Sequence, residues 1–295
     1  MIFCRPCRWR SESELLAAQN YRILPGVYRR LGVATTFSPR FKAVLAESAR
    51  VSRALSAPLY LIHADTFSPE KQERFQSALC ELELGGKAEV RFEPGTPVEA
   101  ILKVQRDAEI DLLIAGALET ESVHRNFTGD VARGLLRNAP CDLLLYTEPR
   151  EDPKAPDDIL VAIPDLTELS HRVYNSALDL AERRGGRRVN LLYVQTTFAE
   201  AKEKARGTSN GTPSTEDVLK SWLEEQQRSD IELDYHLLRG NTGFTACEYI
   251  QASGADLVMM PSQMPGSNEP VFAPALDWIV QVIPANLLVI REARG

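Results

Sequence analysis

The residues best placed to do chemistry lie between Gly95 and Glu148. An apolar run from Asp111 to Ala115 ends at Gly116, and a helix is expected from about Asn126 to Asn138. A glycine lets backbone N–H groups approach an anion, and the N-terminus of a helix carries a partial positive charge. α/β proteins hold phosphate groups with a strand, a glycine turn and a helix in this order. The stretch therefore indicates an anion-binding edge.

The same stretch occurs a second time near the C-terminus. DLLIAG, which starts at Asp111, aligns with DLVMMP, which starts at Asp256, and APCDLLLYTE from Ala139 aligns with IPANLLVIRE from Ile283. The two alignments differ by one residue in the loop between them. Two matches in register, both within matching expected elements, indicate that the chain contains a duplicated unit.

The elements that must position these residues alternate between strands and helices. In the first unit, residues 31–37, 57–65 and 87–92 are expected strands, and the pairs Ser38-Pro39 and Ser68-Pro69 are typical of helix starts. The second unit repeats this order from Ile159. Alternating strands and helices favour right-handed crossovers and parallel strands. We therefore predict an α/β fold with two tandem domains.

The domain boundaries follow from the repeat. Residues 1–28 match nothing downstream and are predicted to form an N-terminal leader, followed by domain 1 at 29–149, a charged linker at 150–157 and domain 2 at 158–295. The leader contains a CxxC pair, Cys4 and Cys7. Without a second pair or histidines, this pair does not define a zinc site. We expect the leader to be mobile or covered by a partner.

Composition limits the classes of partner and the compartment. The formal net charge of −7 argues against nucleic acid. No apolar run approaches the ~18 residues needed to span a bilayer, so no membrane partner is expected. The N-terminus lacks the continuous apolar core of a secretory signal, and the five cysteines form no disulfide framework. We expect a cytoplasmic protein.

With these motifs, the chain resembles the universal stress protein family in its two-domain tandem form. The resemblance covers about Arg29 to Arg291 and rests on FSP after the first strand, GTPVEAI, DLLIAG and LLRNAPCDLLLY. It implies two domains related to adenine nucleotide α-hydrolases, each with a five-stranded parallel sheet flanked by helices. It also implies that the domains pair through their last strands, at Leu143 to Tyr146 and Leu287 to Ile290. A homodimer is a further possibility, and the protein partner is unknown.

The family includes members that bind ATP and members that do not. The binding members share the motif G-x2-G-x9-G-S/T and an aspartate just after the first strand. On this motif, Gly116 and Gly129 match the first and last glycines, whereas Glu119 replaces the middle glycine and Asp130 the hydroxyl residue. Thr36 stands in place of the aspartate.

The replacements in domain 1 change the charge of its expected pocket. Two carboxylates at the phosphate position would repel a triphosphate by a few kcal/mol at low effective dielectric. His124 and Arg125 in the intervening loop could partly compensate. Domain 1 is therefore predicted to hold an eroded nucleotide site.

Domain 2 departs further from the motif. Pro261 and Met264 replace its first two glycines, and Ala273-Pro274 replaces the final pair. Pro274 has no N–H to donate to a phosphate. Asp165 could replace the lost aspartate with a shift of one residue. This pocket is also predicted to be eroded.

Few other residues suggest chemistry. His63 ends the second expected strand, at the edge where ligands of such folds lie, and is either a polar strand-end residue or a ligand contact. No Ser–His–acid order, metal triad or G-x-S-x-G occurs, so we expect neither catalytic residues nor a metal site. The candidate ligand-binding residues are Thr36, His63, Gly116, Arg125, Gly129, Asp130 and Asp165.

Two functions remain open at this point. The first is a non-catalytic regulatory or interaction module of the stress response. The alternative is a sensor that binds ATP, AMP or another small anion in domain 1, through Gly116, Arg125, Gly129 and the helix N-terminus near Asp130. No cofactor is firmly implied, and ATP or AMP is the candidate ligand. A nucleotide hydrolase is disfavoured, because TTFSPR after the first strand is not a phosphate loop.

Overall fold

We describe the protein from a computed structural model. It describes residues 28–117, 130–182, 188–198, 200–201, 214–225, 231–240 and 243–292. Within these ranges, no helix is long and apolar enough to cross a membrane.

The described residues of the first half of the chain form five strands and four helices in alternation. They are β1 (Leu31–Thr35), α2 (Phe41–Leu55), β2 (Leu59–His63), α3 (Pro69–Glu81), β3 (Ala88–Phe92), α4 (Pro97–Asp107), β4 (Leu112–Gly116), α5 (Asp130–Asn138) and β5 (Asp142–Tyr146). Ser68 caps α3, because its Oγ accepts a hydrogen bond from the Lys71 amide at 3.2 Å and Pro69 begins the first turn.

The second half repeats this order. Its elements are β6 (Asp158–Ile163), α6 (Glu168–Glu182), β7 (Arg188–Thr196), α8 (Thr215–Glu225), β8 (Glu232–Gly240), α9 (Gly243–Ser253), β9 (Leu257–Ser262), α10 (Asp277–Val282) and β10 (Asn286–Arg291). The expected alternation of strands and helices is therefore present in both halves.

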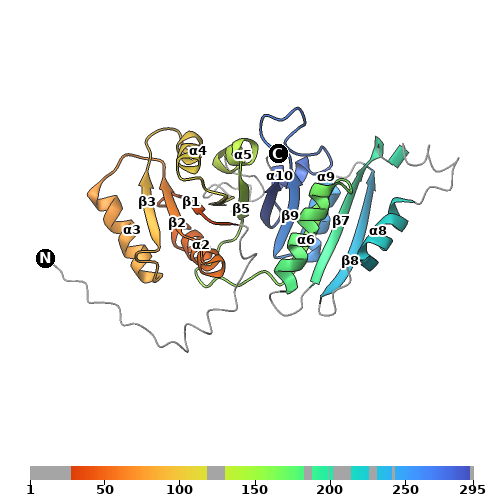
Figure 1. Cartoon of the computed structure of the whole chain (residues 1–295), viewed down its shortest axis with the longest axis horizontal. Helices are drawn as coiled ribbons and strands as arrows, with labels where there is room; N and C mark the ends of the chain where they lie inside the picture. Colours follow the sequence, from red (N-terminus) through yellow and green to blue (C-terminus); the bar gives the residue numbers. More distant parts are fainter. Residues whose placement is uncertain are drawn as a thin grey trace.

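The strands of the described residues all belong to one ten-stranded sheet in the order β3-β2-β1-β4-β5-β10-β9-β6-β7-β8. The strand pairs within each half are parallel, which confirms the prediction of two five-stranded parallel sheets. The halves meet where β5 pairs antiparallel with β10, with Leu145 opposite Leu287. We call this junction the seam. In Figure 1, β3 and β8 lie toward opposite ends of the molecule.

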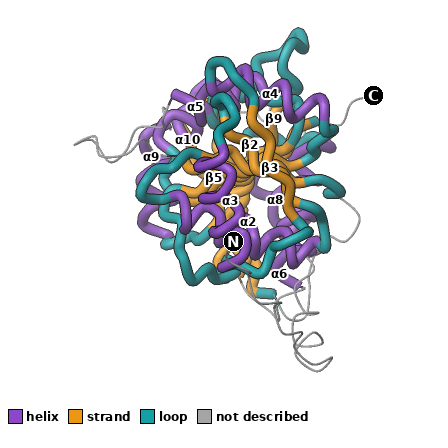
Figure 2. Tube along the Cα trace, turned by 90° about the vertical axis from the view of Figure 1, so that its left-hand side faces the viewer, coloured by secondary structure: helices purple, strands orange, loops and turns teal. Residues whose placement is uncertain are grey.

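The two faces of the sheet carry separate hydrophobic cores. One contains Leu45 of α2, Phe75 of α3, Tyr174 of α6 and Trp222 of α8. The other contains residues of α4, α5, α9 and α10, among them Leu135 and Ile279 in the last turns of α5 and α10. Figure 2 shows the strands at the centre with helices on both sides. Both faces are covered, as expected for parallel strands.

The aspartate that begins DLLIAG and DLVMMP has the same structural role in both halves. Asp111 accepts hydrogen bonds from the two backbone amides before β1 (residues 29–30), at 2.7 and 3.0 Å. Asp256 accepts from the amides of residues 157–158, at 2.9 and 3.1 Å. Each carboxylate therefore ties the entry of the first strand to that of the fourth. The repeated aspartate positions strands at the edge opposite to the candidate sites.

Candidate functional site

The candidate residues of domain 1 lie along one edge of the sheet. β1 runs between β2 and β4 with parallel pairing, so their carboxyl ends lie at the same edge. Thr36 follows β1 and is exposed, His63 ends β2, and Gly116 ends β4. Asp130 begins α5 and is exposed. Arg125 and Gly129 lie outside the described residues, as do Glu119 and His124.

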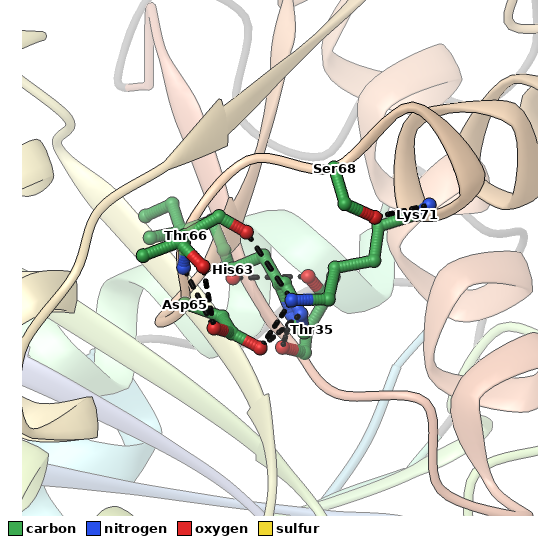
Figure 3. Close-up of polar contacts among 7 residues, drawn as sticks. Thr35, His63, Asp65, Thr66, Ser68 and Lys71 are labelled. Atoms are coloured by element: carbon green, nitrogen blue, oxygen red, sulfur yellow. Dashed lines mark hydrogen bonds and ion pairs between the residues drawn. The ribbon is translucent and has the colours of Figure 1, made fainter.

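His63 is held in place by its neighbours. Its Nδ1 lies 3.1 Å from the carbonyl oxygen of Thr35, and its Nε2 lies 3.9 Å from Oδ2 of Asp65. Asp65 in turn accepts hydrogen bonds from Nζ of Lys71 at 2.5 Å and from the Thr66 amide at 2.7 Å. Figure 3 shows this chain of contacts from Thr35 to Lys71. The hydrogen bond from Lys71 is the main reason that the pKa of Asp65 is lowered.

An aromatic cluster fills the space beside His63. The Phe37 ring centroid lies 5.1 Å from that of His63 and 4.7 Å from that of Phe75. Phe92 approaches His63 edge-on at 5.8 Å, and the Arg74 guanidinium lies 3.9 Å from the Phe37 centroid. Edge-to-face and tilted packing of this kind is favourable for aromatic rings. The chain directly after Thr36 is therefore used for packing between β2 and α3.

Sequence reasoning missed this cluster. Its members come from β2, α3, β3 and the segment between β1 and α2, so no local pattern predicts that they meet. The one available signal is the spacing of Phe37 and Phe41, whose centroids lie 5.4 Å apart across the start of α2.

Among the described residues, little packs against Gly116. A Cβ atom at this position would meet one heavy atom of these residues within 4 Å, Cγ2 of Val44, at 3.6 Å, which is an ordinary contact. Packing against the described residues therefore does not require glycine here. The next amide, that of Ala117, already donates to the carbonyl oxygen of Tyr146 at 2.8 Å. One N–H group beside Gly116 is thus occupied by the sheet.

Asp130 lies at the position where a helix N-terminus would attract an anion. α5 spans nine residues, and Asp130 is the acidic residue of its first turn. A carboxylate there complements the positive end of the helix dipole. The protein thereby places a negative charge of its own where a phosphate would bind.

In domain 2, the loop after β9 is closed by internal hydrogen bonds. The Gln263 amide donates to the Val271 carbonyl oxygen at 2.9 Å, and Ser262 Oγ contacts the same oxygen at 2.9 Å. The helix that follows, α10, has six residues and no side-chain cap. The Gln263 amide of this loop is therefore paired within the protein, and the helix that follows the loop is short.

A buried guanidinium holds this loop. Arg291 is 3% exposed, and its side chain donates to Ser262 Oγ, to the Gln263 carbonyl oxygen at 3.5 Å and to the Leu136 carbonyl oxygen of domain 1. Its guanidinium carbon lies 5.6 Å from the Phe272 centroid. Burial lowers the pKa of Arg291 to about 10. The sequence analysis did not select Arg291 as a functional residue. The available signal is the repeat alignment, in which Arg291 of the second unit corresponds to Thr147 of the first.

Asp165 is used locally at the start of α6. Its Oδ1 accepts hydrogen bonds from the Thr167 amide at 3.1 Å, the Thr167 hydroxyl at 2.7 Å and the Ser170 hydroxyl at 2.9 Å. β6 pairs with β9 as β1 pairs with β4, and this register makes Asp165 the counterpart of Phe37. The two positions therefore support their helices differently, one by hydrogen bonds and one by aromatic packing.

Within the described ranges, no group of three or more His, Cys, Asp or Glu side chains could hold a metal ion. The candidate residues thus divide into three groups. Thr36, His63 and Gly116 share the edge of domain 1, Asp130 begins its last helix, and Asp165 lies in domain 2.

Comparison with known proteins identifies the fold and the family. The chain is similar to a candidate universal stress protein from Pseudomonas aeruginosa UCBPP-PA14, at 14% identity and a TM-score of 0.67 over 93% of this chain and 95% of that one. A protein of unknown function from Pseudomonas aeruginosa PAO1 gives 14% identity, a TM-score of 0.67 and coverage of 93% and 94%. A universal stress protein from Archaeoglobus fulgidus DSM 4304 gives 16% identity and a TM-score of 0.62 over 89% of this chain and 98% of that one. No curated protein sequence matches the chain.

The sequence itself matches the model of the Universal stress protein family in two segments. These are residues 66–147 and 156–291, which lie in the first and second halves of the sheet. Together they cover well over half of the chain, in agreement with the tandem form that the motifs suggested. The chain belongs to the universal stress protein family.

Proposed function

We propose that this protein is a non-catalytic regulatory or interaction module of the stress response, with nucleotide sites that no longer hold a triphosphate. The observation that carries the proposal is the loop after β9. Its Gln263 amide pairs with Val271, and the Arg291 guanidinium donates to Ser262 and Gln263. A phosphate would have to break these bonds to reach the loop.

Domain 1 supports the same proposal through charge and packing. Asp130 places a carboxylate at the start of α5, and Glu119 adds a second at the position of the middle glycine. After β1, the side chain of Phe37 packs in the aromatic cluster. Thr36, at the position of the motif aspartate, has no carboxylate to accept hydrogen bonds from a ribose or adenine. The repulsion and the missing acceptor both act against a nucleotide.

The absence of catalysis is part of the proposal. Of the described histidines, His63 lies at the candidate edge, and both its ring nitrogens face oxygen atoms of the protein, Thr35 O and Asp65 Oδ2. A general base needs a nitrogen within hydrogen-bond reach of a substrate proton. His63 is better explained as a link between the ends of β1 and β2.

Mass spectrometry of the small molecules released from purified protein tests this function. We expect no stoichiometric ATP, ADP or AMP. Recovery of one nucleotide per chain would overturn the proposal. Light scattering on the same sample gives the oligomeric state and shows whether the module exists as a single chain or as a homodimer.

A sensor for ATP, AMP or another small anion is the second candidate. It is favoured by Gly116, a glycine that packing does not require, at the edge where a ligand would approach. Calorimetry with ATP on the double reversion Glu119→Gly and Asp130→Ser tests whether these two carboxylates are what closes the site. If the carboxylates alone block the site, the reversion creates ATP binding. If no heat appears, the aromatic cluster and the missing aspartate close the site as well.

A further inference from the structure

The central strands of the sheet form the floor of a groove on one face. On this face α2 packs on β1, β2 and β4, whereas α6 packs on β6, β7 and β9. In Figure 1, α2 and α6 lie on either side of the region around β5. The face of β5 and β10 between them is bordered by the chain that follows β5 and by Tyr28.

A cavity of about 820 Å³ occupies this position, and we call it the seam groove. Volumes of this size suit small-molecule ligands, which are often bound at domain interfaces. Its apolar part is formed by aliphatic side chains from both halves of the protein: Val51, Leu55, Leu144, Leu180, Leu257 and Leu288.

Four cations border the domain 1 side of the seam groove. They are Arg40, Arg50, Arg150 and Lys154. Arg40 donates to the Thr147 carbonyl oxygen at 3.0 Å. In the described part of the chain, the side chains of Arg150 and Lys154 have no ion-pair partner, and both residues are exposed.

Of these four cations, Arg50 is the one whose side chain is held in place by contacts with its neighbours. Its Nε lies 3.3 Å from Glu47 Oε2, and its Nη2 lies 3.2 Å from the Tyr146 hydroxyl. Its Nη1 is buried and has no hydrogen-bond partner among the described residues. A buried guanidinium donor without a partner is unfavourable, and a carboxylate would satisfy it with a strong charge-assisted bond.

The acidic residues of the groove are largely occupied. Glu47 is 4% exposed and faces Arg50, and the Asp256 carboxylate accepts the amides of residues 157–158. Glu148 is exposed. The charge available to a ligand on the domain 1 side is therefore positive.

We propose that the seam groove binds an amphipathic organic anion. The apolar body lies on the leucine side chains of β5 and β10, and a single carboxylate is held by Arg50 with Arg150 and Lys154. The site is separate from both nucleotide positions, so it does not depend on the function proposed above.

The opposite end of the seam provides an internal comparison. A cavity of about 680 Å³ lies there, bordered by three arginines, Arg106, Arg172 and Arg291, and by four acidic residues, Glu109, Asp111, Asp142 and Glu292. Arg172 donates to the Arg291 carbonyl oxygen, and Arg291 to Ser262 and Leu136. Its acidic lining makes it the poorer site for an anion.

Calorimetry with dodecanoate, kept below its micelle concentration at pH 8, tests the proposal on the full chain. We expect saturable binding of one dodecanoate per chain and no binding of dodecanol. Arg50→Gln and the exposed double variant Arg150→Gln/Lys154→Gln should each weaken binding by roughly tenfold, through the loss of charge-assisted contacts. Lys42→Gln, an exposed change elsewhere on α2 where Lys42 pairs with Glu81, should not.

Each other outcome overturns the proposal. These outcomes are no binding of dodecanoate, equal binding of dodecanol, or unchanged affinity in the double variant. Arg50→Gln could disturb the contacts of Glu47 and Tyr146, so its thermal unfolding is measured in parallel. The double variant lies on the exposed linker and keeps the test valid if Arg50→Gln is unstable.

Discussion

The backbone amide of Arg291 donates a hydrogen bond to the Asp142 carboxylate, with 2.8 Å between N and Oδ1. At the other end of the seam, the Thr147 amide donates to the side-chain oxygen of Asn286 at 3.0 Å. In the repeat alignment Asp142 corresponds to Asn286, and Arg291 to Thr147. The same bond therefore closes both ends of the seam, once with a carboxylate and once with an amide.

The carboxylate end makes the stability of the seam depend on pH. Burial raises the pKa of Asp142, against the opposing hydrogen bonds from Tyr28 and from the Arg291 amide. Above the unfolded pKa of about 3.9 and below the folded pKa, the native state holds more protons than the unfolded state. In this window the contribution of Asp142 to stability falls as pH rises.

Asp142→Asn should remove this dependence, since an amide serves at the equivalent Asn286. We expect the free energy of unfolding of the variant, relative to the natural chain, to increase between about pH 3.5 and about pH 7. Urea denaturation across this range measures it. Asp152→Asn in the linker, where the residue is exposed, is the control. A difference that stays constant with pH would contradict the prediction.

Arg291→Met should destabilise the protein by about 3 kcal/mol, because it removes the buried guanidinium that donates to Ser262 Oγ and to the carbonyl oxygens of Gln263 and Leu136. Arg188→Gln is the matched control. Arg188 pairs with Asp158 but is 38% exposed, so its loss should cost less than about 1 kcal/mol. Chemical denaturation of both variants gives the comparison, and equal losses would show that Arg291 does not hold the loop.

Gly134→Ala should destabilise α5 although alanine is the better helix former. A Cβ at residue 134 would lie 2.5 Å from Cγ2 of Val98 in α4 and 3.4 Å from its Cβ. The expected overpacking cost of about 1–3 kcal/mol exceeds the propensity gain of about 1 kcal/mol. The pair Gly134→Ala/Val98→Ala should recover part of the loss in thermal unfolding. Gly116→Ala, with its contact at 3.6 Å, should be nearly neutral.

The cysteines should differ in reactivity in the folded protein. Cys141 and Cys247 are buried, and burial raises the pKa of their thiols to about 12 and about 11. Cys80, in contrast, is exposed. Since the thiolate is the reactive form, iodoacetamide at about pH 8 should modify Cys80 well before the other two. Peptide mapping by mass spectrometry reads out the order, and early modification of Cys141 would be incompatible with its burial.

The fold could be predicted from the sequence because its signals are local or repeated. The alternation of strands and helices is visible in short windows of sequence. The alignment of Asp111 with Asp256 predicts that the second half repeats the elements of the first. The side-chain contacts at the candidate sites could not be predicted in the same way. The Phe37 cluster and the Arg291 contacts join residues that are far apart in the chain, and their side chains meet only once the strands are placed side by side.

The sequence also does not predict which groups of the protein contact the candidate residues. Asp165 suggested a ligand contact, and the structure gives it Thr167 and Ser170 as hydrogen-bond donors. His63 suggested either a strand-end residue or a ligand contact, and its ring lies against Thr35 and Phe37. Residue type and position at a strand end indicate where a ligand could bind, but local hydrogen bonds decide whether the group is free to bind it.

Titration calorimetry of the natural chain with Mg-ATP tests the central claim most directly. The occupied loop of domain 2 and the carboxylates and aromatic cluster of domain 1 lead us to expect no saturable heat at either site. Arg291→Met provides the sensitive comparison, because it removes the guanidinium that holds the domain 2 loop. Saturable binding of one or two ATP molecules to the natural chain would contradict the claim that its nucleotide sites are closed.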